Sequence, residues 1–139
     1  MKNILSIILY CVVADVFALG CNVHTWHNVS AKEGTWKLNL QVISQQGYFV
    51  DETCHEIKTK DITKEQPLKY GFGFAKDADF NIAYTLTAVN EDKGFQSKAC
   101  VFVISATGPA QPEIKVLNYH GANCLWNLVP GTGEDFIIQ

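Results

Sequence analysis

The chain has 139 residues, of which 47% are hydrophobic and 12% aromatic, and its formal net charge is −3. Its 11 cationic side chains are all lysines, and arginine is absent from the sequence. Because guanidinium groups supply most bidentate contacts to bases and phosphates, this composition argues against a nucleic-acid-binding protein. The lysines form no polybasic cluster, so we expect no nucleic-acid partner and no attachment to a membrane surface.

Residues 1–20 predict a secretory signal peptide. One cation precedes an apolar run that is too short to span a bilayer comfortably. Small residues suit cleavage after Ala18 or after Gly20, which leaves a β domain at 21–139 of about 119 to 121 residues. A mature chain of this size forms one domain, which excludes a multidomain enzyme. We therefore expect a soluble protein that is secreted and extracellular.

The cysteine count agrees with export. Cys11 leaves with the signal peptide, and an even number of cysteines remains: Cys21, Cys54, Cys100 and Cys124. An even count in a short secreted chain predicts two disulfide bonds. Of the three possible pairings we favour Cys21–Cys54 with Cys100–Cys124, because each joins neighbours along the chain; each loop is worth about 3 to 4 kcal/mol in the chain-entropy model. An alternative interpretation takes Cys21 as the lipid anchor of a bacterial lipoprotein.

Alternation of apolar and polar residues with a period of two recurs along the mature chain, whereas helical spacing is hard to find. The strands that this alternation predicts lie at 36–42, 48–57, 68–74, 80–88, 95–106, 113–119, 124–129 and 134–138. About eight short strands with turn signals between them predict an all-β, single-domain sandwich or barrel that is stapled by disulfides.

Three details of this pattern make sharper predictions. The charged stretch 58–64 interrupts the alternation and predicts a solvated loop. The strands at 68–74 and 80–88 flank a polar turn and predict a hairpin. The run Val101–Ile104 is apolar on both faces, which predicts a central strand covered on each side.

The only candidate metal constellation is His24-x-x-His27 together with His55 and His120. Imidazoles three residues apart can share a metal on a helix, but this segment has no helical pattern. We therefore interpret all four as ordinary surface or turn histidines, and we expect no metal and no cofactor.

Catalytic arrangements have little support in the sequence. An even cysteine count leaves no thiol nucleophile, and no serine lies in a Gly-x-Ser-x-Gly context. His55 with Glu56 offers an acid and a base for a ribonuclease, but the guanidinium that usually stabilises the phosphate oxyanion is missing. A glycosidase needs two carboxylates, and the candidates are Asp51, Glu52, Glu56, Asp77 and Asp79. These residues fall at predicted turns and strand edges, where acidic side chains usually only contact solvent. We expect no catalytic residue.

Two further sites are predicted outside catalysis. Asn28-Val29-Ser30 is the sole Asn-x-Ser/Thr sequon, so Asn28 is the glycosylation site that we expect in a eukaryotic secretory pathway. In the run from Tyr70 to Gly73 the aromatics share one face, while Gly71 and Gly73 leave the other face bare. Glycine weakens a strand, so something should approach closely there: a neighbouring side chain, a bend of the sheet, or a ligand or partner backbone. Tyr70, Gly71, Phe72 and Gly73 are therefore the candidate binding surface.

The overall layout resembles that of small secreted fungal β-barrels of the Alternaria major-allergen type, and it is similar in kind to β-sandwich effectors of plant-pathogenic fungi. The resemblance rests on the signal peptide, Cys21-Asn22-Val23 near the mature terminus, a strand ending in Cys54, the aromatic strand at 70–74, and the late pair Cys100 and Cys124. A cysteine that follows Cys54 closely in the allergen family is absent. This resemblance implies an exported interaction protein, a virulence effector that acts on a host protein, with no catalytic residues to carry over.

The sequence thus predicts a secreted, non-enzymatic domain that binds another protein through its surface. The main alternative is a carrier of a small apolar ligand or a carbohydrate-binding module, which would use exposed aromatics among Trp26, Tyr48, Tyr70 and Trp126. A small hydrolase is the second alternative, and the oligomeric state stays open.

Overall fold

The alternating pattern of the mature chain produces ten β-strands in the computed structural model, which describes residues 23–43, 47–73, 81–91, 96–107, 112–129 and 133–139. Among these residues there is no α-helix, and hence no helix that could cross a membrane. The predicted signal peptide lies outside the described residues. The strands are β1 (Val23–Ala31), β2 (Trp36–Val42), β3 (Tyr48–Val50), β4 (Thr59–Ile62), β5 (Leu68–Gly73), β6 (Asn81–Asn90), β7 (Ala99–Thr107), β8 (Glu113–Tyr119), β9 (Cys124–Val129) and β10 (Gly133–Ile138).

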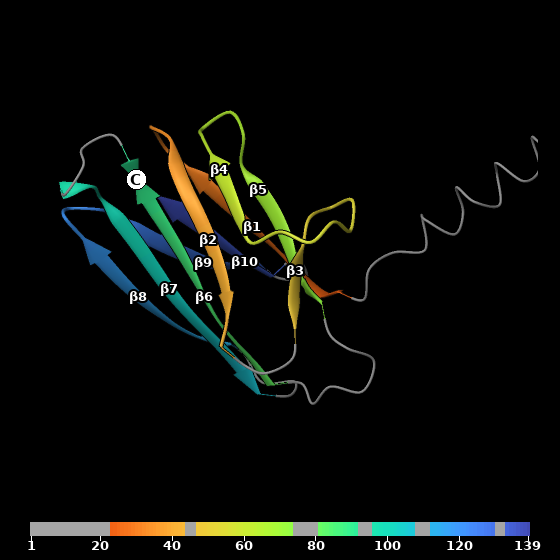
Figure 1. Cartoon of the computed structure of the whole chain (residues 1–139). Helices are drawn as coiled ribbons and strands as arrows, with labels where there is room; N and C mark the ends of the chain where they lie inside the picture. Colours follow the sequence, from red (N-terminus) through yellow and green to blue (C-terminus); the bar gives the residue numbers. More distant parts are fainter. Residues whose placement is uncertain (1–22, 44–46, 74–80, 92–95, 108–111, 130–132) are drawn as a thin grey trace, which may run out of the picture.

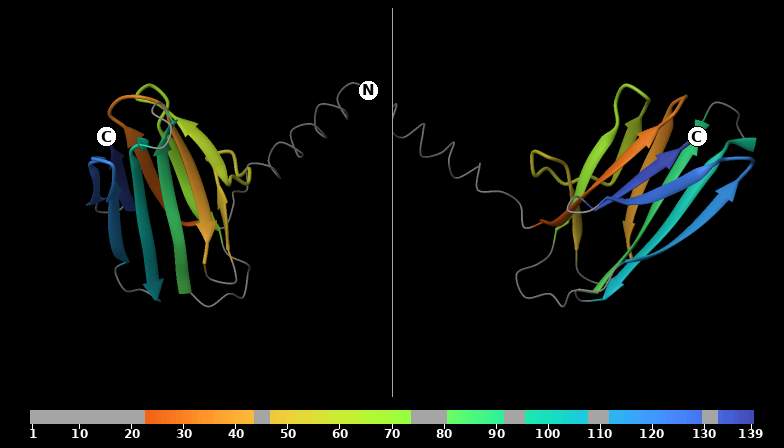
Figure 2. Two further views of the ribbon diagram at one scale, coloured as in Figure 1. Left: turned by 60° about the vertical axis from the view of Figure 1, so that its left-hand side comes forward. Right: turned by 180° about the vertical axis from the view of Figure 1, so that it is seen from behind.

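The ten strands form two five-stranded sheets that pack face to face as an open sandwich (Figure 1). Sheet A has the order β3-β5-β1-β10-β9, and sheet B has the order β4-β2-β6-β7-β8. The pair β1 and β10 is parallel, and the other pairs are antiparallel. The outer strands β8 and β9 lie on one side of the molecule, and β3 and β4 lie on the other (Figures 1 and 2). The all-β prediction is therefore confirmed as a sandwich rather than a closed barrel.

The period-two pattern sorts side chains between the interior and solvent as predicted. In β2 the side chains of Trp36, Leu38 and Leu40 are buried between the sheets, while Lys37 and Asn39 are exposed. The same alternation runs through β10, where every second residue is buried. Each strand therefore contributes one face to a common interior.

Two predicted boundaries in the first half of the chain are wrong. The strand predicted at 48–57 ends at Val50, because Asp51 starts a turn in which its carbonyl accepts a hydrogen bond from the Cys54 backbone N–H at 3.0 Å. The stretch predicted as a solvated loop contains β4, which pairs with β2. Lys60 and Asp61 are exposed there because β4 is the outer strand of sheet B, and outer strands tolerate charge.

The predicted hairpin of 68–74 with 80–88 is also wrong. β5 pairs with β1 and β3 in sheet A, whereas β6 pairs with β2 and β7 in sheet B. Alternation determines which side chains face the interior, but both sheets share one interior. The two strands consequently face each other across the sandwich instead of pairing within a sheet.

β7 lies between β6 and β8, so its central position within a sheet is confirmed, but the prediction of a cover on each face is not. Phe102 and Ile104 are buried in the interior, while Val101 and Val103 on the opposite face are half-buried. No strand of the two sheets lies over this outer face. The apolar residues of β7 thus contribute to two surfaces: one faces the interior between the sheets, and the other is the outer face of sheet B.

Aromatic side chains from both sheets fill one end of the interior. The ring of Phe49 packs edge-to-face against the rings of Tyr70, Phe72 and Tyr84, with centroids 5.0 to 6.0 Å apart. The hydroxyls of Tyr70 and Tyr84 meet at 2.8 Å. Burial raises the pKa of both phenols above their usual value near 10, and the nearby charge of Glu134 adds to the rise. The pair is a neutral hydrogen bond that joins β5 to β6 across the sandwich.

Replacing one tyrosine of this pair should cost more than half of what replacing both costs. In Tyr70→Phe or Tyr84→Phe the remaining buried hydroxyl has no partner, so we expect each to lower the free energy of unfolding by about 1 to 3 kcal/mol. The double variant leaves no orphaned hydroxyl and should lose less than the sum of the two single losses. Urea unfolding measures all three, and strictly additive losses would contradict the pairing.

The same variants should change how stability depends on alkaline pH. Unfolded tyrosines lose their protons near pH 10, whereas the buried pair keeps them because its pKa values are raised. The unfolded state then binds fewer protons, so the free energy of unfolding falls as pH rises above about 10. Urea unfolding on both sides of pH 10 should show a shallower fall in Tyr70→Phe/Tyr84→Phe than in the wild type. Equal slopes would refute this explanation.

Candidate functional site

The segment predicted as a binding surface is buried within the fold. Tyr70 and Phe72 point into the aromatic core, so neither is open to a partner. The groups that approach Gly71 and Gly73 closely, as predicted, are side chains of neighbouring strands. A Cβ at Gly71 would lie 2.3 Å from Val23 Cγ1, and one at Gly73 would lie 2.5 Å from the ring of Tyr48. Tyr70, Gly71, Phe72 and Gly73 therefore present no free surface.

A buried polar pair joins β1 to β10. The His27 Nδ1 atom lies 2.5 Å from Glu134 Oε2, and both side chains are buried. The backbone N–H of Glu134 also points at Nδ1, at 3.3 Å, but one ring nitrogen cannot accept and donate at once, so the shorter contact dominates. The ring of His27 lies 5.3 Å from that of Tyr70 and 6.5 Å from that of Phe136. The pair therefore links β1 to β10 in the interior, with two aromatic rings beside the imidazole.

Gly133 permits the close approach of these two strands. It has a positive φ of 97°, and a Cβ at this position would lie 2.4 Å from the Trp26 carbonyl oxygen. Only glycine fits such a conformation without displacing backbone. The last strand of the chain can therefore enter sheet A directly beside the first, in parallel.

The four histidines do not converge on one site. His27 is engaged with Glu134, while His55 and His120 are exposed in separate turns. The side chain of His24 lies outside the described residues. Within the described residues, no three His, Cys, Asp or Glu side chains come close enough together to hold a metal ion.

The acidic cluster around Asp51 holds a turn in place. Its Oδ1 atom accepts hydrogen bonds from the Thr53 hydroxyl at 2.6 Å, the Thr53 N–H at 2.9 Å and the His55 N–H at 3.0 Å. The hydroxyl bond is the largest cause of a lowered pKa for Asp51. Thr53 Oγ1 also lies 2.6 Å from His55 Nδ1, and since a carboxylate is the stronger acceptor, the hydroxyl donates to Asp51 and accepts from the imidazole. The threonine is thus not activated as a nucleophile.

The remaining carboxylates are dispersed. Glu52 and Glu56 are exposed in the same region, whereas Asp77 and Asp79 lie outside the described residues. Asn28, the predicted glycosylation site, lies in the middle of β1 on the outer face of sheet A. Its Nδ2 donates to Asp135 Oδ1 at 2.9 Å, and a glycan on this nitrogen would leave it a single N–H to donate. Glycosylation stays a prediction.

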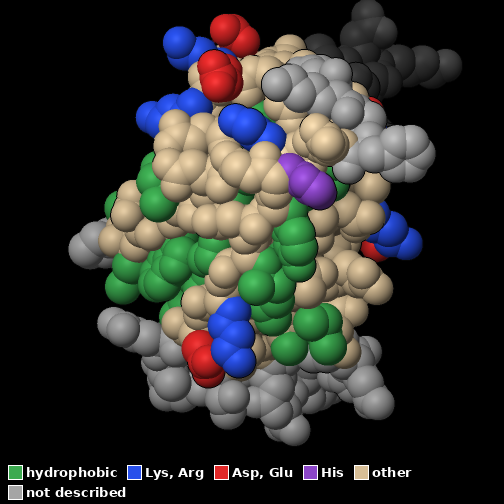
Figure 3. All heavy atoms as spheres, turned by 90° about the vertical axis from the view of Figure 1, so that its left-hand side faces the viewer, with side chains coloured by type: hydrophobic (Ala, Val, Ile, Leu, Met, Phe, Trp, Pro, Cys, Tyr) green, Lys and Arg blue, Asp and Glu red, His purple; other side chains and the backbone are tan. Residues whose placement is uncertain are grey.

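One side of the sandwich carries almost no charge. The chain has 14 acidic residues and 11 lysines, but between Ala99 and Gly133 only Glu113 and Lys115 are charged. This stretch contains β7, β8 and β9. The space-filling view of this side shows hydrophobic side chains gathered in the middle, with the Lys, Asp and Glu side chains toward the margins (Figure 3). Four large hydrophobic residues here are 46 to 48% exposed: Leu117 and Tyr119 on β8, and Leu125 and Leu128 on β9.

The exposed residues of β8 continue the outer face of β7. Leu117 lies directly opposite Val101, and Tyr119 lies opposite Ala99. Since directly paired residues point to the same face of a sheet, these side chains and Val103 form one apolar surface, hereafter the β7–β8 face. Lys115, opposite Val103, marks its charged end, where its Nζ lies 3.9 Å from Glu113 Oε1.

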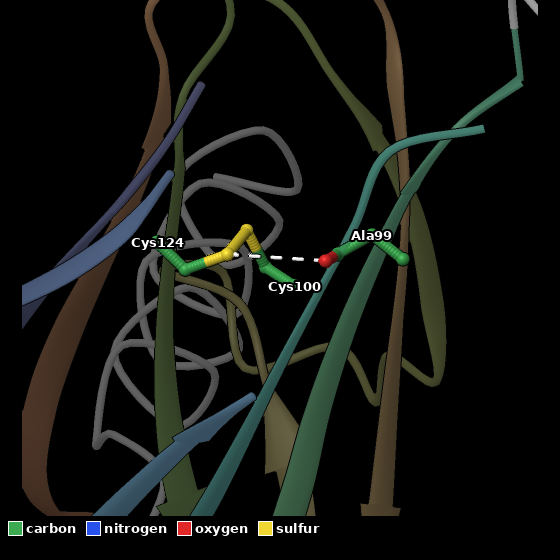
Figure 4. Close-up of a disulfide and its surroundings, with 3 residues drawn as sticks. All are labelled: Ala99, Cys100 and Cys124. Carbon is green, nitrogen blue, oxygen red and sulfur yellow. Dashed lines mark hydrogen bonds between the residues drawn. A yellow bond between two sulfur atoms is a disulfide. The ribbon is translucent and has the colours of Figure 1, made fainter. Parts of the chain in front are cut away.

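A disulfide anchors this side of the molecule. Cys100 on β7 in sheet B is bonded to Cys124 on β9 in sheet A, with Cα atoms 5.7 Å apart (Figure 4). Cys124 Sγ lies 3.9 Å from the Ala99 carbonyl oxygen, which is a packing contact because a disulfide sulfur carries no hydrogen. The Cys100–Cys124 pairing is confirmed. Cys54 is also disulfide-bonded, and its predicted partner Cys21 lies outside the described residues.

The signal for the uncharged side was present in the sequence but is not a motif. It is the scarcity of Lys, Asp and Glu between Ala99 and Gly133, where only Glu113 and Lys115 are charged, and an analysis of alternation alone does not detect it. β1 was also missed, because its inward positions include the polar His27 beside Val29 and Ala31. A strand whose buried face carries a paired histidine does not have the expected apolar period.

Comparisons with known proteins support the fold alone. No protein-family model and no curated protein sequence matches this chain. Among solved structures, the chain is similar to the RahU protein, whose structure was determined in complex with a TRIS molecule. The match has a TM-score of 0.57 and 11% sequence identity, and it covers 82% of this chain and 93% of RahU. The architecture is therefore shared across nearly the whole of that protein, while the sequences have little in common.

Removal of the Cys100–Cys124 bond should destabilise the domain strongly. Both sulfur-bearing side chains are buried, and the bond closes a loop of 24 residues between the two sheets. We expect the double variant Cys100→Ala/Cys124→Ala to lose about 3 kcal/mol in free energy of unfolding, measured by guanidinium unfolding of the otherwise oxidised protein. A variant as stable as the wild type would show that strand pairing alone orders this side.

Proposed function

We propose that this chain is a non-enzymatic protein-binding domain whose contact surface is the β7–β8 face. The observation that carries the proposal is the half-exposure of Leu117 and Tyr119 beside Val101 on a face that lacks charge over most of its length. Large apolar side chains in a contiguous uncharged patch are characteristic of interaction sites.

The chemistry of this face favours a protein partner. Interface centres are depleted of charged residues and enriched in tyrosine, which matches the combination of Tyr119 with Leu117 and valines. Small ligands bind in concave pockets, whereas this surface is the outer face of a β-sheet. The partner should therefore present an extended neutral, apolar surface. Complete burial of Leu117 and Tyr119, each about half exposed, would contribute about 1 kcal/mol or more per side chain.

The polar clusters of the described residues are engaged within the fold, which favours binding over catalysis. His27 and Glu134 bond to each other in the interior, and Asp51, Thr53 and His55 hold a turn. An effector role, in which the partner is a host protein, is the specific form of this proposal. It depends on the export that residues 1–20 predict.

One observation favours a carbohydrate-binding function as the second candidate. On the outer face of sheet A, Asn28, Asp135 and Asn127 are neighbours in register across β1, β10 and β9. The half-buried ring of Trp26 lies on the same face of β1, with Lys69 Nζ 5.9 Å from its centroid. Planar polar side chains beside an aromatic ring suit sugar recognition. This group lies on the opposite sheet from the β7–β8 face, so variants can separate the two functions.

The experiment is affinity capture with the oxidised mature protein from extracts of its natural surroundings. Wild type is compared with Leu117→Lys/Tyr119→Lys, which places two charges in the β7–β8 face. The matched control is Asn39→Lys/Gln41→Lys on the exposed outer face of β2, in the same sheet. We expect a protein to be captured by the wild type and by the control, but at least about tenfold less by the Leu117/Tyr119 variant.

Three outcomes would overturn the proposal. The first is capture that the Leu117 and Tyr119 substitutions leave unchanged. The second is binding of glycans that is lost on Trp26→Ala but not on Leu117→Lys/Tyr119→Lys. The third is binding of the wild type to lipid vesicles without any protein partner. Unfolding midpoints of both lysine variants serve as the check that the fold is retained, since all four positions lie on the outer surface.

A further inference from the structure

Of the four strands at the edges of the sheets, β9 differs from the other three. The outer edge of β3 is covered, because the Ile57 N–H donates to the Phe49 carbonyl at 2.9 Å and Val50 bridges to Glu56. β4 carries Lys60 and Asp61, and β8 carries Glu113 and Lys115. Natural edge strands use such charges, or a cover, to block pairing with another chain.

β9 has none of these protections among the described residues. Its sequence, Cys-Leu-Trp-Asn-Leu-Val, contains no charge and no proline. All six of its residues pair with β10 in an unbroken antiparallel register, and no described strand pairs with its other side. The Cys100–Cys124 disulfide ties its first residue to β7, so this edge is held in place before any partner arrives.

The two exposed leucines of β9 lie on opposite faces of sheet A. Leu125 pairs with Ile137 on the outer face, while Leu128 pairs with the buried Glu134 on the inner face, yet the leucines are 46% and 47% exposed. A partner resting on one face of the sheet would cover only one of them. An additional strand along the edge borders both faces and covers both.

We infer that β9 pairs in antiparallel fashion with β9 of a second copy of this chain, with Asn127 on the two-fold axis. Two identical antiparallel strands are related by a two-fold axis, and directly opposite residues share a face. With Asn127 at the centre, Trp126 lies opposite the partner's Leu128, and Leu125 lies opposite the partner's Val129. From Leu125 to Val129, each apolar side chain then meets an apolar one, and Asn127 meets the partner's Asn127. Centring on Trp126 would instead place Leu125 against the partner's Asn127.

The net charge of the chain does not oppose this occupant. The chain has a net charge of −3, so two copies repel each other unless they meet where no acidic residue lies. The acidic residue nearest to the axis on the outer face is Asp135, which pairs with Asn127. Across the dimer, Asp135 and the partner's Asp135 would be three strand spacings apart, about 14 Å. This exceeds the Debye length of about 8 Å at physiological salt, so the repulsion is screened.

The dimer is independent of the proposed function, because β9 belongs to sheet A and the β7–β8 face belongs to sheet B. The two surfaces can be occupied together, which would give a complex with two partner sites. Loss of one interaction therefore does not entail loss of the other.

Disulfide trapping tests the register directly. Opposite residues of an antiparallel pair have Cα atoms about 4.5 to 5.5 Å apart, within the range that a disulfide bridges. In Asn127→Cys the new thiols would lie opposite each other and form a covalent dimer under mild oxidation. In the matched variant Leu125→Cys the new thiols would be about 14 Å apart along the strands and stay unlinked. We expect the first variant, but not the second, to run as a dimer on non-reducing gels.

Sedimentation velocity of the oxidised mature protein over a concentration series tests the association without new thiols. We expect a monomer–dimer equilibrium in the wild type, weakened roughly tenfold or more by Leu125→Lys and unchanged by Leu117→Lys on β8. Unfolding midpoints check that both variants are folded, since both leucines are half exposed. A wild type that stays monomeric throughout, equal cross-linking of the two cysteine variants, or a dimer broken by Leu117→Lys alone would each overturn the inference.

Discussion

The packing of aromatic side chains across the interior is the contact on which the rest of this structure depends. Tyr70 and Phe72 from β5 meet Tyr84 from β6, and Phe49 packs edge-to-face against all three. These rings come from different sheets, so they hold the two layers at a fixed spacing. Among the described residues, the buried polar side-chain atoms are paired, as in the two tyrosine hydroxyls and in His27 with Glu134. Both proposed interactions accordingly use outer surfaces of the described molecule.

The outer surfaces are not equivalent. On the side of β3 and β4, a turn organised by Asp51 covers one edge and charged residues protect the other. On the side of β7, β8 and β9, charge is almost absent and four large hydrophobic side chains are half exposed. Exposed apolar surface is a liability for a monomer, and among the described residues most of the large exposed hydrophobic side chains lie on this one side. Both proposals for this protein follow from that asymmetry, one for each sheet.

The disulfide between Cys100 and Cys124 fixes the strands on the uncharged side of the molecule relative to each other. It crosses from β7 to β9, and the intervening β8 is the outer strand of sheet B. It holds the start of β9, the outer strand of sheet A, against β7 of sheet B. A rigid edge loses less conformational entropy on binding than a mobile one, which favours association.

The sequence by itself determined the fold class and the locations of most strands, because alternation is a local property that each segment carries whatever surrounds it. β2, β8 and β9 were predicted at the residues where they occur, and the Cys100–Cys124 bond followed from parity and proximity along the chain. Only the tertiary structure decided which strands share a sheet, since both sheets bury their apolar faces in one interior and the pattern of a strand does not record its neighbours. That is why β5 and β6 were mistaken for a hairpin and why Tyr70 to Gly73 were mistaken for an exposed surface. The uncharged side likewise emerged only when β7, β8 and β9 were brought together, because an exposed leucine becomes part of a continuous apolar surface through spatial neighbours that the chain alone does not specify.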